Sequence, residues 1–240
     1  MKIGSIGIGR KLYEPKSGMK FRIAAQDHYG PGITTLLCEH VVGVRALDAA
    51  EPDRPCSSLY EDVTRFGNNN YPGSNLNTYL NSADQHWYAP FSGYDCPPDA
   101  THTRYGEFPY DTMPGFLTQF SESMLAHLVY TDIPVLVRTG KGQAELQSVN
   151  AAVFLPSRTE MNKGDELGIP EGRPLPIFYD HYIFKAVPAP DQLEKYGRLW
   201  QPEEPEHGLY YDIAQMYDPK FGWWYYMLPL THYMRFCSVS

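Results

Sequence analysis

The residues best suited to contact a ligand are concentrated near the end of this 240-residue chain. Residues 221–229 contain two tryptophans and two tyrosines, and residues 231–240 add histidine, tyrosine, arginine and hydroxyl side chains. Tyr and Trp offer a large, rigid contact area at low entropic cost, and His, Ser and Thr add adaptable hydrogen bonds. The segment predicts a strand, a turn and a second strand that bind a protein or glycan. The ligand-binding residues predicted on this basis are Tyr225, Tyr226, Thr231, His232, Tyr233 and Arg235.

The alternative for this aromatic cluster is that its side chains fill the core. Successive side chains of a strand point to opposite faces, so a half-buried strand hides every second one. We therefore expect half of the cluster in the core, and the sequence leaves open which face is solvated. The two faces are Trp223, Tyr225 and Met227 on one side and Trp224, Tyr226 and Leu228 on the other.

No pattern typical of catalysis or metal binding accompanies this segment. The eight histidines show no His-Glu-x-x-His or His-x-His spacing, and neither a Gly-x-Ser-x-Gly elbow nor a P-loop occurs. The four cysteines have no C-x-x-C spacing, so we interpret them as reduced thiols, with a Cys38–Cys237 bridge as the alternative. The sequence predicts no catalytic residue, no metal ligand and no cofactor, and hence a protein that is not an enzyme.

Charge and hydropathy exclude two further classes of partner. The formal net charge is −8, and the chain lacks the basic stripe of a nucleic-acid-binding protein. No apolar run approaches the ~20 residues of a membrane-spanning helix. Glycines interrupt residues 1–10, which lack the continuous apolar core of a signal peptide. We therefore expect no nucleic-acid partner, no membrane insertion and synthesis without a signal peptide.

Short strands are the first kind of element that must position the C-terminal segment. Residues 21–25 and 33–38 predict a β-hairpin around a turn rich in glycine and proline, and residues 41–44 extend it. Residues 133–137 and 149–155 predict two further strands. The 20 glycines and 21 prolines indicate that such elements are joined by long, punctuated loops.

Two modest helices complete the predicted set. Ser74 is placed to cap a short helix that ends near Asn81. A longer helix is predicted to start at Gly115, because apolar residues then recur every four positions. Those residues are Phe116, Phe120, Met124 and Leu128. Residues 157–160 have capping-box spacing and predict one more helical turn.

Together these elements predict an α+β fold with short antiparallel strands, two modest helices and long loops. No internal repeat and no linker divide the chain. We expect residues 1–20 to form an N-terminal arm and residues 21–240 a single domain.

An ordered set of short motifs runs from about residue 20 to the C-terminus. Examples are Gln26-Asp27-His28-Tyr29-Gly30, Gly67-Asn68-Asn69-Asn70-Tyr71, Ser74-Asn75-Leu76-Asn77-Thr78-Tyr79, Val153-Phe154-Leu155-Pro156-Ser157-Arg158-Thr159-Glu160 and Gly222-Trp223-Trp224-Tyr225-Tyr226. The set resembles an uncharacterised domain family of bacteriophage tail-type and gut-bacterial surface proteins.

The resemblance implies a C-type-lectin-like fold, related to that of formylglycine-generating enzymes. Some members of the wider group are variable proteins of diversity-generating retroelements, which carry their diversified residues at the C-terminus. The matching positions are 225–240, which adds Ser238 and Ser240 to the expected ligand-binding residues. The sequence departs from the family pattern at two points. Met227-Leu228 stands before the turn proline, where the family has an arginine and a small residue. The closing strand of the family does not follow Ser240.

A lectin-like fold raises the question of calcium. Glu51-Pro52-Asp53 is similar to the Glu-Pro-Asn motif that binds calcium and sugar in lectins. It lies far upstream of the usual place of that motif, and no Trp-Asn-Asp partner follows it. Calcium requires six to eight oxygen ligands, and no spaced loop supplies them. We interpret the segment as an acidic turn.

The sequence therefore predicts a non-enzymatic binding protein on a phage tail, a virion surface or a bacterial cell surface, where it recognises a host-surface protein or glycan. One alternative is a virion structural or decoration protein that binds only sister subunits. Another is a formylglycine-generating-type oxidase, which needs a reactive cysteine pair where only Cys237 lies. The N-terminal arm and the missing closing strand leave edges that favour a homo-oligomer or virion subunits as partners.

Overall fold

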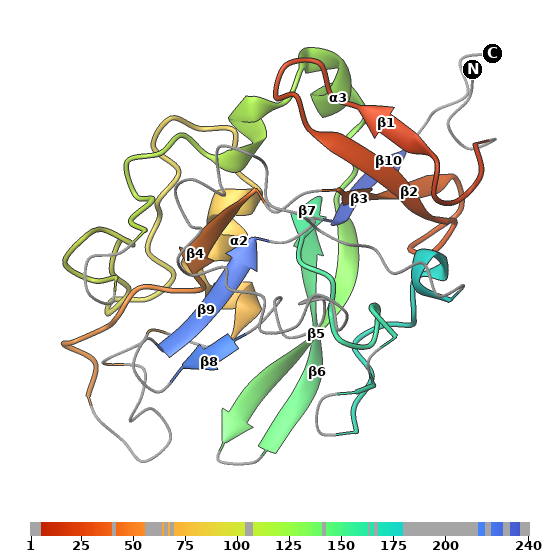
Figure 1. The fold of residues 1–240 in the computed structure, drawn as a ribbon. Helices are drawn as coiled ribbons and strands as arrows, with labels where there is room; N and C mark the ends of the chain where they lie inside the picture. Colours follow the sequence, from red (N-terminus) through yellow and green to blue (C-terminus); the bar gives the residue numbers. More distant parts are fainter. Residues whose placement is uncertain are drawn as a thin grey trace.

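A five-stranded antiparallel sheet joins strands from the two ends of the chain (Figure 1). The computed structural model describes residues 6–39, 42–55, 64, 67, 70–103, 108–140, 143–162, 164–165, 168–179, 216–218, 222–227 and 231–235, and for the last three ranges it describes the backbone. The order of strands in the sheet is β1 (Lys11–Tyr13), β2 (Lys20–Gln26), β3 (Ile33–Cys38), β10 (Thr231–Arg235) and β7 (Val153–Phe154).

Strands β2 and β3 form the predicted hairpin, which is confirmed. Asp27 has a φ of 53° at the turn, and its Oδ1 accepts a hydrogen bond from the Gly32 N–H. All six residues of β3 are buried, because the sheet is covered on both faces.

The predicted N-terminal arm contains β1, an edge strand in which Lys11 pairs with Arg22. Both of these cations also lie within 2.8 Å of the Glu39 carboxylate.

Two smaller sheets hold the remaining strands. One has the order β4 (Gly43–Ala46), β9 (Gly222–Met227) and β8 (Met216–Asp218), and the other pairs β5 (Thr131–Gly140) with β6 (Gln143–Ala151). The prediction that residues 41–44 extend the hairpin is wrong, since β4 pairs with β9 in a different sheet. Figure 1 shows the β5–β6 ribbon extending from one end of the molecule.

The first predicted helix is confirmed at both ends. A 3-10 turn, η2 (Tyr71–Gly73), leads into α2 (Asn75–Leu80). The Ser74 side chain accepts a hydrogen bond from the Asn77 N–H, which satisfies one of the amide groups left open at a helix start. Asn81 follows as the C-cap.

The second predicted helix is wrong as a single element. The segment forms a 3-10 helix, η4 (Phe116–Gln119), and then a separate α-helix, α3 (Glu122–His127). Phe120 and Ser121 between them are extended, and the Ser121 Oγ caps α3 by accepting a hydrogen bond from the Met124 N–H. The Ser121 N–H is held at 3.0 Å by Oε1 of the buried Glu14, so a contact distant in sequence fixes the break.

The predicted strand over residues 149–155 is divided at Ala152 into β6 and β7. The Asn81 side chain lies at this point, where its Oδ1 accepts hydrogen bonds from the N–H groups of Ala152 and Val153.

The capping box at residues 157–160 is confirmed. Ser157 N donates to Glu160 Oε2, Glu160 N donates to Ser157 Oγ, and a single helical bond joins Met161 N to Ser157 O.

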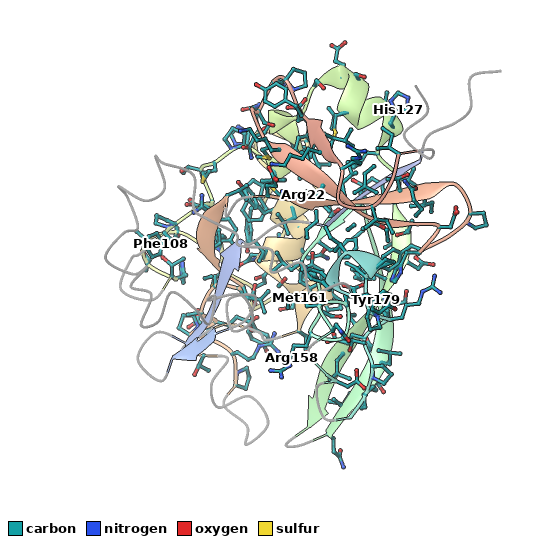
Figure 2. The ribbon with its side chains drawn as sticks, turned by 45° about the vertical axis from the view of Figure 1, so that its right-hand side comes forward. Arg22, Phe108, His127, Arg158, Met161 and Tyr179 are labelled. Carbon is teal, nitrogen blue, oxygen red and sulfur yellow. The ribbon has the colours of Figure 1, made fainter. Side chains whose placement is uncertain are left out.

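Three apolar clusters fill the interior. The largest packs one face of β2 and β3 against α2, η4 and the aromatic residues Trp87 and Tyr110. A second joins Ile33 and Phe154 to the valines of β5, and a third covers the other face of β2 and β3 with Leu175 and with Ile177 of η5 (Pro176–Phe178). Met161, labelled in Figure 2, is also buried. The result is a mixed α+β fold of few helices, short antiparallel strands and long loops.

Candidate functional site

The C-terminal strands that carry most of the predicted ligand-binding residues occupy central positions in two sheets. In β9, Tyr225 pairs with Arg45 and Tyr226 pairs with Val44. On its other side β9 pairs with β8. The two strands predicted for the C-terminal segment are thus confirmed, and they belong to different sheets.

Strand β10 lies between β3 and β7, whose residues are fully buried. His232 pairs with Leu36 and Val153, and Tyr233 pairs with Thr35. Thr231 and Arg235 pair with Leu37 and Ile33 at the ends of the same ladder. The backbone register therefore places the predicted binding residues of β10 opposite core residues of the sheet. Ser238, Ser240 and Cys237 lie outside the described residues, as does Cys56.

A different set of chemically reactive side chains meets in the loops beside α2. The carboxylates of Asp48, Glu51 and Asp95 each offer an oxygen, and these oxygens all lie within 4.8 Å of one another. Asp48 and Glu51 are buried and Asp95 is half-buried. Like charges at such distances repel, so each carboxylate requires donors or a counter-charge.

Asn75, the first residue of α2, supplies much of that stabilisation. Its N–H donates to Asp48 Oδ1 at 2.9 Å, and its Nδ2 donates to Asp95 Oδ1 at 3.2 Å. Its Oδ1 accepts a hydrogen bond from the Ala49 N–H at 2.8 Å. One buried amide therefore ties α2 to both acidic segments.

Arg54 supplies the counter-charge. Its Nε forms an ion pair with Glu51 Oε2, and its Nη2 donates to Ser92 Oγ at 3.3 Å. Its guanidinium carbon lies 5.4 Å from the centre of the Tyr94 ring, within the range of a cation–π contact. The expected acidic turn is present, since Arg54 N donates to Glu51 O.

Residues 88–96, which we call the aromatic loop, contribute Asp95 to this group of carboxylates. Asp95 fixes the loop, because its Oδ2 accepts a hydrogen bond from Phe91 N at 2.7 Å and its main-chain oxygen accepts one from the Tyr88 hydroxyl at 2.9 Å. Phe91 and Tyr94 nevertheless remain 72% and 43% exposed. Two large rings are thus presented to solvent by a loop whose backbone is held in place.

The edge of the Phe91 ring rests on a glycine. A Cβ added at Gly73 would lie 2.9 Å from Phe91 Cε1, a distance that ordinary packing does not allow. The absence of a side chain at Gly73 therefore permits the position of the Phe91 ring beside η2.

Burial and the neighbouring carboxylates raise the pKa values of two groups in the loop. Burial raises the pKa of the Tyr88 hydroxyl to about 12, and the Asp95 carboxylate adds to the rise. Burial also raises the pKa of the Cys96 thiol, with further contributions from Asp95 and Glu51. Cys96 is therefore held as a protonated, weakly nucleophilic thiol.

The three carboxylates could hold a hard cation, since calcium and magnesium prefer oxygen ligands. Four of their six oxygens already accept hydrogen bonds or pair with Arg54. The sequence predicted no metal ligand here, because Asp95 is far from Asp48 in the chain and no spacing motif joins them. The signal that could have pointed to the site is the Asp48-x-x-Glu51 pair before a proline turn.

A family model described as "Domain of unknown function (DUF6273)" matches residues 34–196. The chain belongs to the DUF6273 family. The matched residues of this DUF6273 protein include the three carboxylates and the aromatic loop, and strands β8, β9 and β10 follow the matched region. No curated protein and no solved structure matches the chain. Within the part of the chain that the structure describes, no helix has the length and apolar character needed to cross a membrane.

Proposed function

We propose that this DUF6273 protein is a non-enzymatic ligand-binding protein whose main contact surface is the aromatic loop. The observation that carries the proposal is the exposure of Phe91 and Tyr94 on a loop whose backbone is held by hydrogen bonds at Phe91 and Asp95. Aromatic side chains have few rotatable bonds and lose little entropy on binding, which is why they dominate many recognition surfaces. The hydrogen-bonded backbone adds to this pre-organisation.

The biological setting of the proposal comes from the resemblance to phage tail-type and gut-bacterial surface proteins. It favours receptor recognition or adhesion on a virion or cell surface, on a C-type-lectin-like fold. A mixed fold with short strands and long loops is compatible with that expectation.

The C-terminal residues remain a second proposed contact surface of the same protein. Their strands lie in the centres of two sheets, so any contact must use a sheet face or the segment after Arg235. Tyr226 and Tyr233 serve as the test positions for this surface.

Adsorption of fluorescently labelled protein to intact gut-bacterial cells tests the proposal. We expect saturable adsorption that the double variant Phe91→Ala/Tyr94→Ala reduces by about tenfold or more, since each ring contributes on the order of 1 kcal/mol. Tyr13→Ala is the matched control, because Tyr13 is 64% exposed on β1, away from the loop.

Adsorption that survives the double variant but is lost in Tyr226→Ser or Tyr233→Ser would assign binding to the C-terminal surface instead. The absence of saturable adsorption, together with assembly of the protein into large oligomers, would favour the alternative of a virion structural protein.

A further inference from the structure

We propose that the aromatic loop and the acidic residues around it bind a positively charged peptide segment, with arginine or lysine side chains stacked on Phe91 and Tyr94. This inference rests on the proposed function and names the chemistry of its ligand. Two independent observations carry it: the nature of the exposed rings and the distribution of charge.

The exposed rings form the first part of the argument. An aromatic face carries negative charge density and attracts a cation within about 6 Å of its centre. The protein already uses this interaction here, since the Arg54 guanidinium lies 5.4 Å from the centre of the Tyr94 ring. Phe91 is the most exposed of the large apolar side chains in the described residues. Among those residues, Arg45 lies over Tyr110 and Arg54 over Tyr94, and no cation lies over the Phe91 ring.

The distribution of charge forms the second part. Residues 46–103 contain eight acidic residues and two arginines, so this quarter of the chain carries a formal charge of −6 out of a total of −8. The segment contains no lysine. Among the described residues, the carboxylates of Asp48, Glu51 and Asp95 lie together beside the loop, and those of Asp53 and Asp99 act on Cys96 within it, against the single counter-charge of Arg54.

The burial of individual carboxylates divides their roles. Asp48 and Glu51 are buried and already engaged by Asn75 and Arg54, so they contribute a field and no direct ligand contact. Asp95 is half-buried and both of its oxygens already accept hydrogen bonds, so it too contributes a field. Asp53 is exposed and is therefore placed to meet a cationic side chain. The raised pKa values of Tyr88 and Cys96, caused first by burial and then by these carboxylates, agree with a negative potential at the loop.

The combination selects one class of occupant. An anionic partner would be repelled, and a purely apolar one would have to remove water from the neighbouring carboxylates. A guanidinium offers a flat face for stacking and N–H donors for carboxylates at the same time. A basic, extended protein segment satisfies both requirements.

The test measures binding of the full chain to a fluorescein-labelled peptide of six arginines separated by glycines. Fluorescence anisotropy of the peptide reports the binding at 20 mM and at 150 mM NaCl. We expect binding that weakens at the higher salt, because exposed charge pairs are screened. Phe91→Ala/Tyr94→Ala should weaken binding about tenfold or more, and Asp53→Asn about two- to fivefold. Gly73→Ala should also weaken binding, because its Cβ would displace the Phe91 ring without removing it.

The controls are Tyr13→Ala, Glu145→Gln and the same peptide with citrulline in place of arginine. Tyr13 and Glu145 are exposed residues of β1 and β6, so their variants should bind like the wild type, and the citrulline peptide should not bind. Binding that the double variant retains, or the absence of salt-sensitive binding, overturns the inference. If cells still adsorb the protein through the aromatic loop in that case, the proposed function stands and only the cationic ligand is wrong.

Discussion

At the scale of single residues, Glu160 is a carboxyl group enclosed by the protein. It is 3% exposed and completes the capping box with Ser157. Burial raises the pKa of Glu160 to about 8 against the opposing hydrogen bond from Ser157, and the nearby Glu171 carboxylate adds to the rise. Glu160 is therefore protonated in the folded protein at neutral pH.

This raised pKa predicts a decline of stability with pH. The folded state retains a proton on Glu160 that the unfolded state releases near pH 4.5, so the free energy of unfolding falls as the pH rises from about 4.5 to about 8. Glu160→Gln keeps an acceptor for Ser157 N and cannot ionise. Urea denaturation should show similar stability for the two proteins at pH 4.5 and an advantage of at least about 1 kcal/mol for the variant at pH 8.5.

Glu145→Gln, at an exposed position of β6, controls for the general effect of removing a negative charge. Parallel loss of stability with pH in the wild type and in Glu160→Gln would show that Glu160 does not titrate in this range.

At the scale of elements, Asn81 links helix α2 to the junction of β6 and β7. Its Oδ1 accepts from Ala152 N at 2.9 Å and from Val153 N at 3.0 Å, and its Nδ2 donates to Val153 O at 2.9 Å. Asn81→Ala removes the acceptor of the buried Ala152 and Val153 N–H groups, which should reduce the free energy of unfolding by about 2–4 kcal/mol. Chemical denaturation measures the loss.

Two comparisons define this prediction. Asn81→Asp retains the acceptor oxygen and loses the donor, so a smaller loss is expected. Asn150→Ala removes an exposed side chain that bonds Asp132 and should cost less than about 0.5 kcal/mol. Equal losses in Asn81→Ala and Asn150→Ala would contradict the role assigned to Asn81.

The helices show which structural features local sequence can predict. The cap at Ser74 was predictable because its partner, Asn77, lies three residues away. The break at Ser121 was not, since the apolar spacing continues through it and the N–H that it presents is held by Glu14. For the same reason the hairpin of β2 and β3 was predictable, because its turn contact joins the nearby Asp27 and Gly32. The sheet of β4 was not predictable, because β4 pairs with a strand from the end of the chain.

The candidate site follows the same rule. The aromatic C-terminal strands were recognisable from their composition, but their sheet partners depend on contacts across most of the chain. The spacing of Asp48 and Glu51 gives half of the acidic group, but Asp95 joins them through Asn75, which bonds both loops, and residue spacing could not predict that contact. The exposure of Phe91 is likewise a tertiary property, because the sequence alone cannot distinguish an exposed ring from a buried one.

At the scale of the whole molecule, β10 is expected to be essential for cooperative folding. Removal of residues 231–240 would leave both β3 and β7 without their shared neighbour and would open the central sheet. We expect such a chain to lose its cooperative thermal transition, since a few kcal/mol is a large part of the stability of a domain. Tyr13→Ala, at an exposed position of β1, is the control and should shift the Tm by only a few degrees. Differential scanning calorimetry of both proteins tests this, and a retained transition without residues 231–240 would refute it.

The place of β10 also has a consequence for the time at which the protein folds in the cell. Leu37 and its ladder partner Thr231 are separated by roughly 200 residues, and a ribosome adds about 5–20 residues per second. Strand β3 therefore leaves the ribosome roughly 10–40 s before the strand that pairs with it. During that interval its apolar edge is accessible to chaperones and to other nascent chains, and the central sheet is completed only after residues 231–235 have been synthesised.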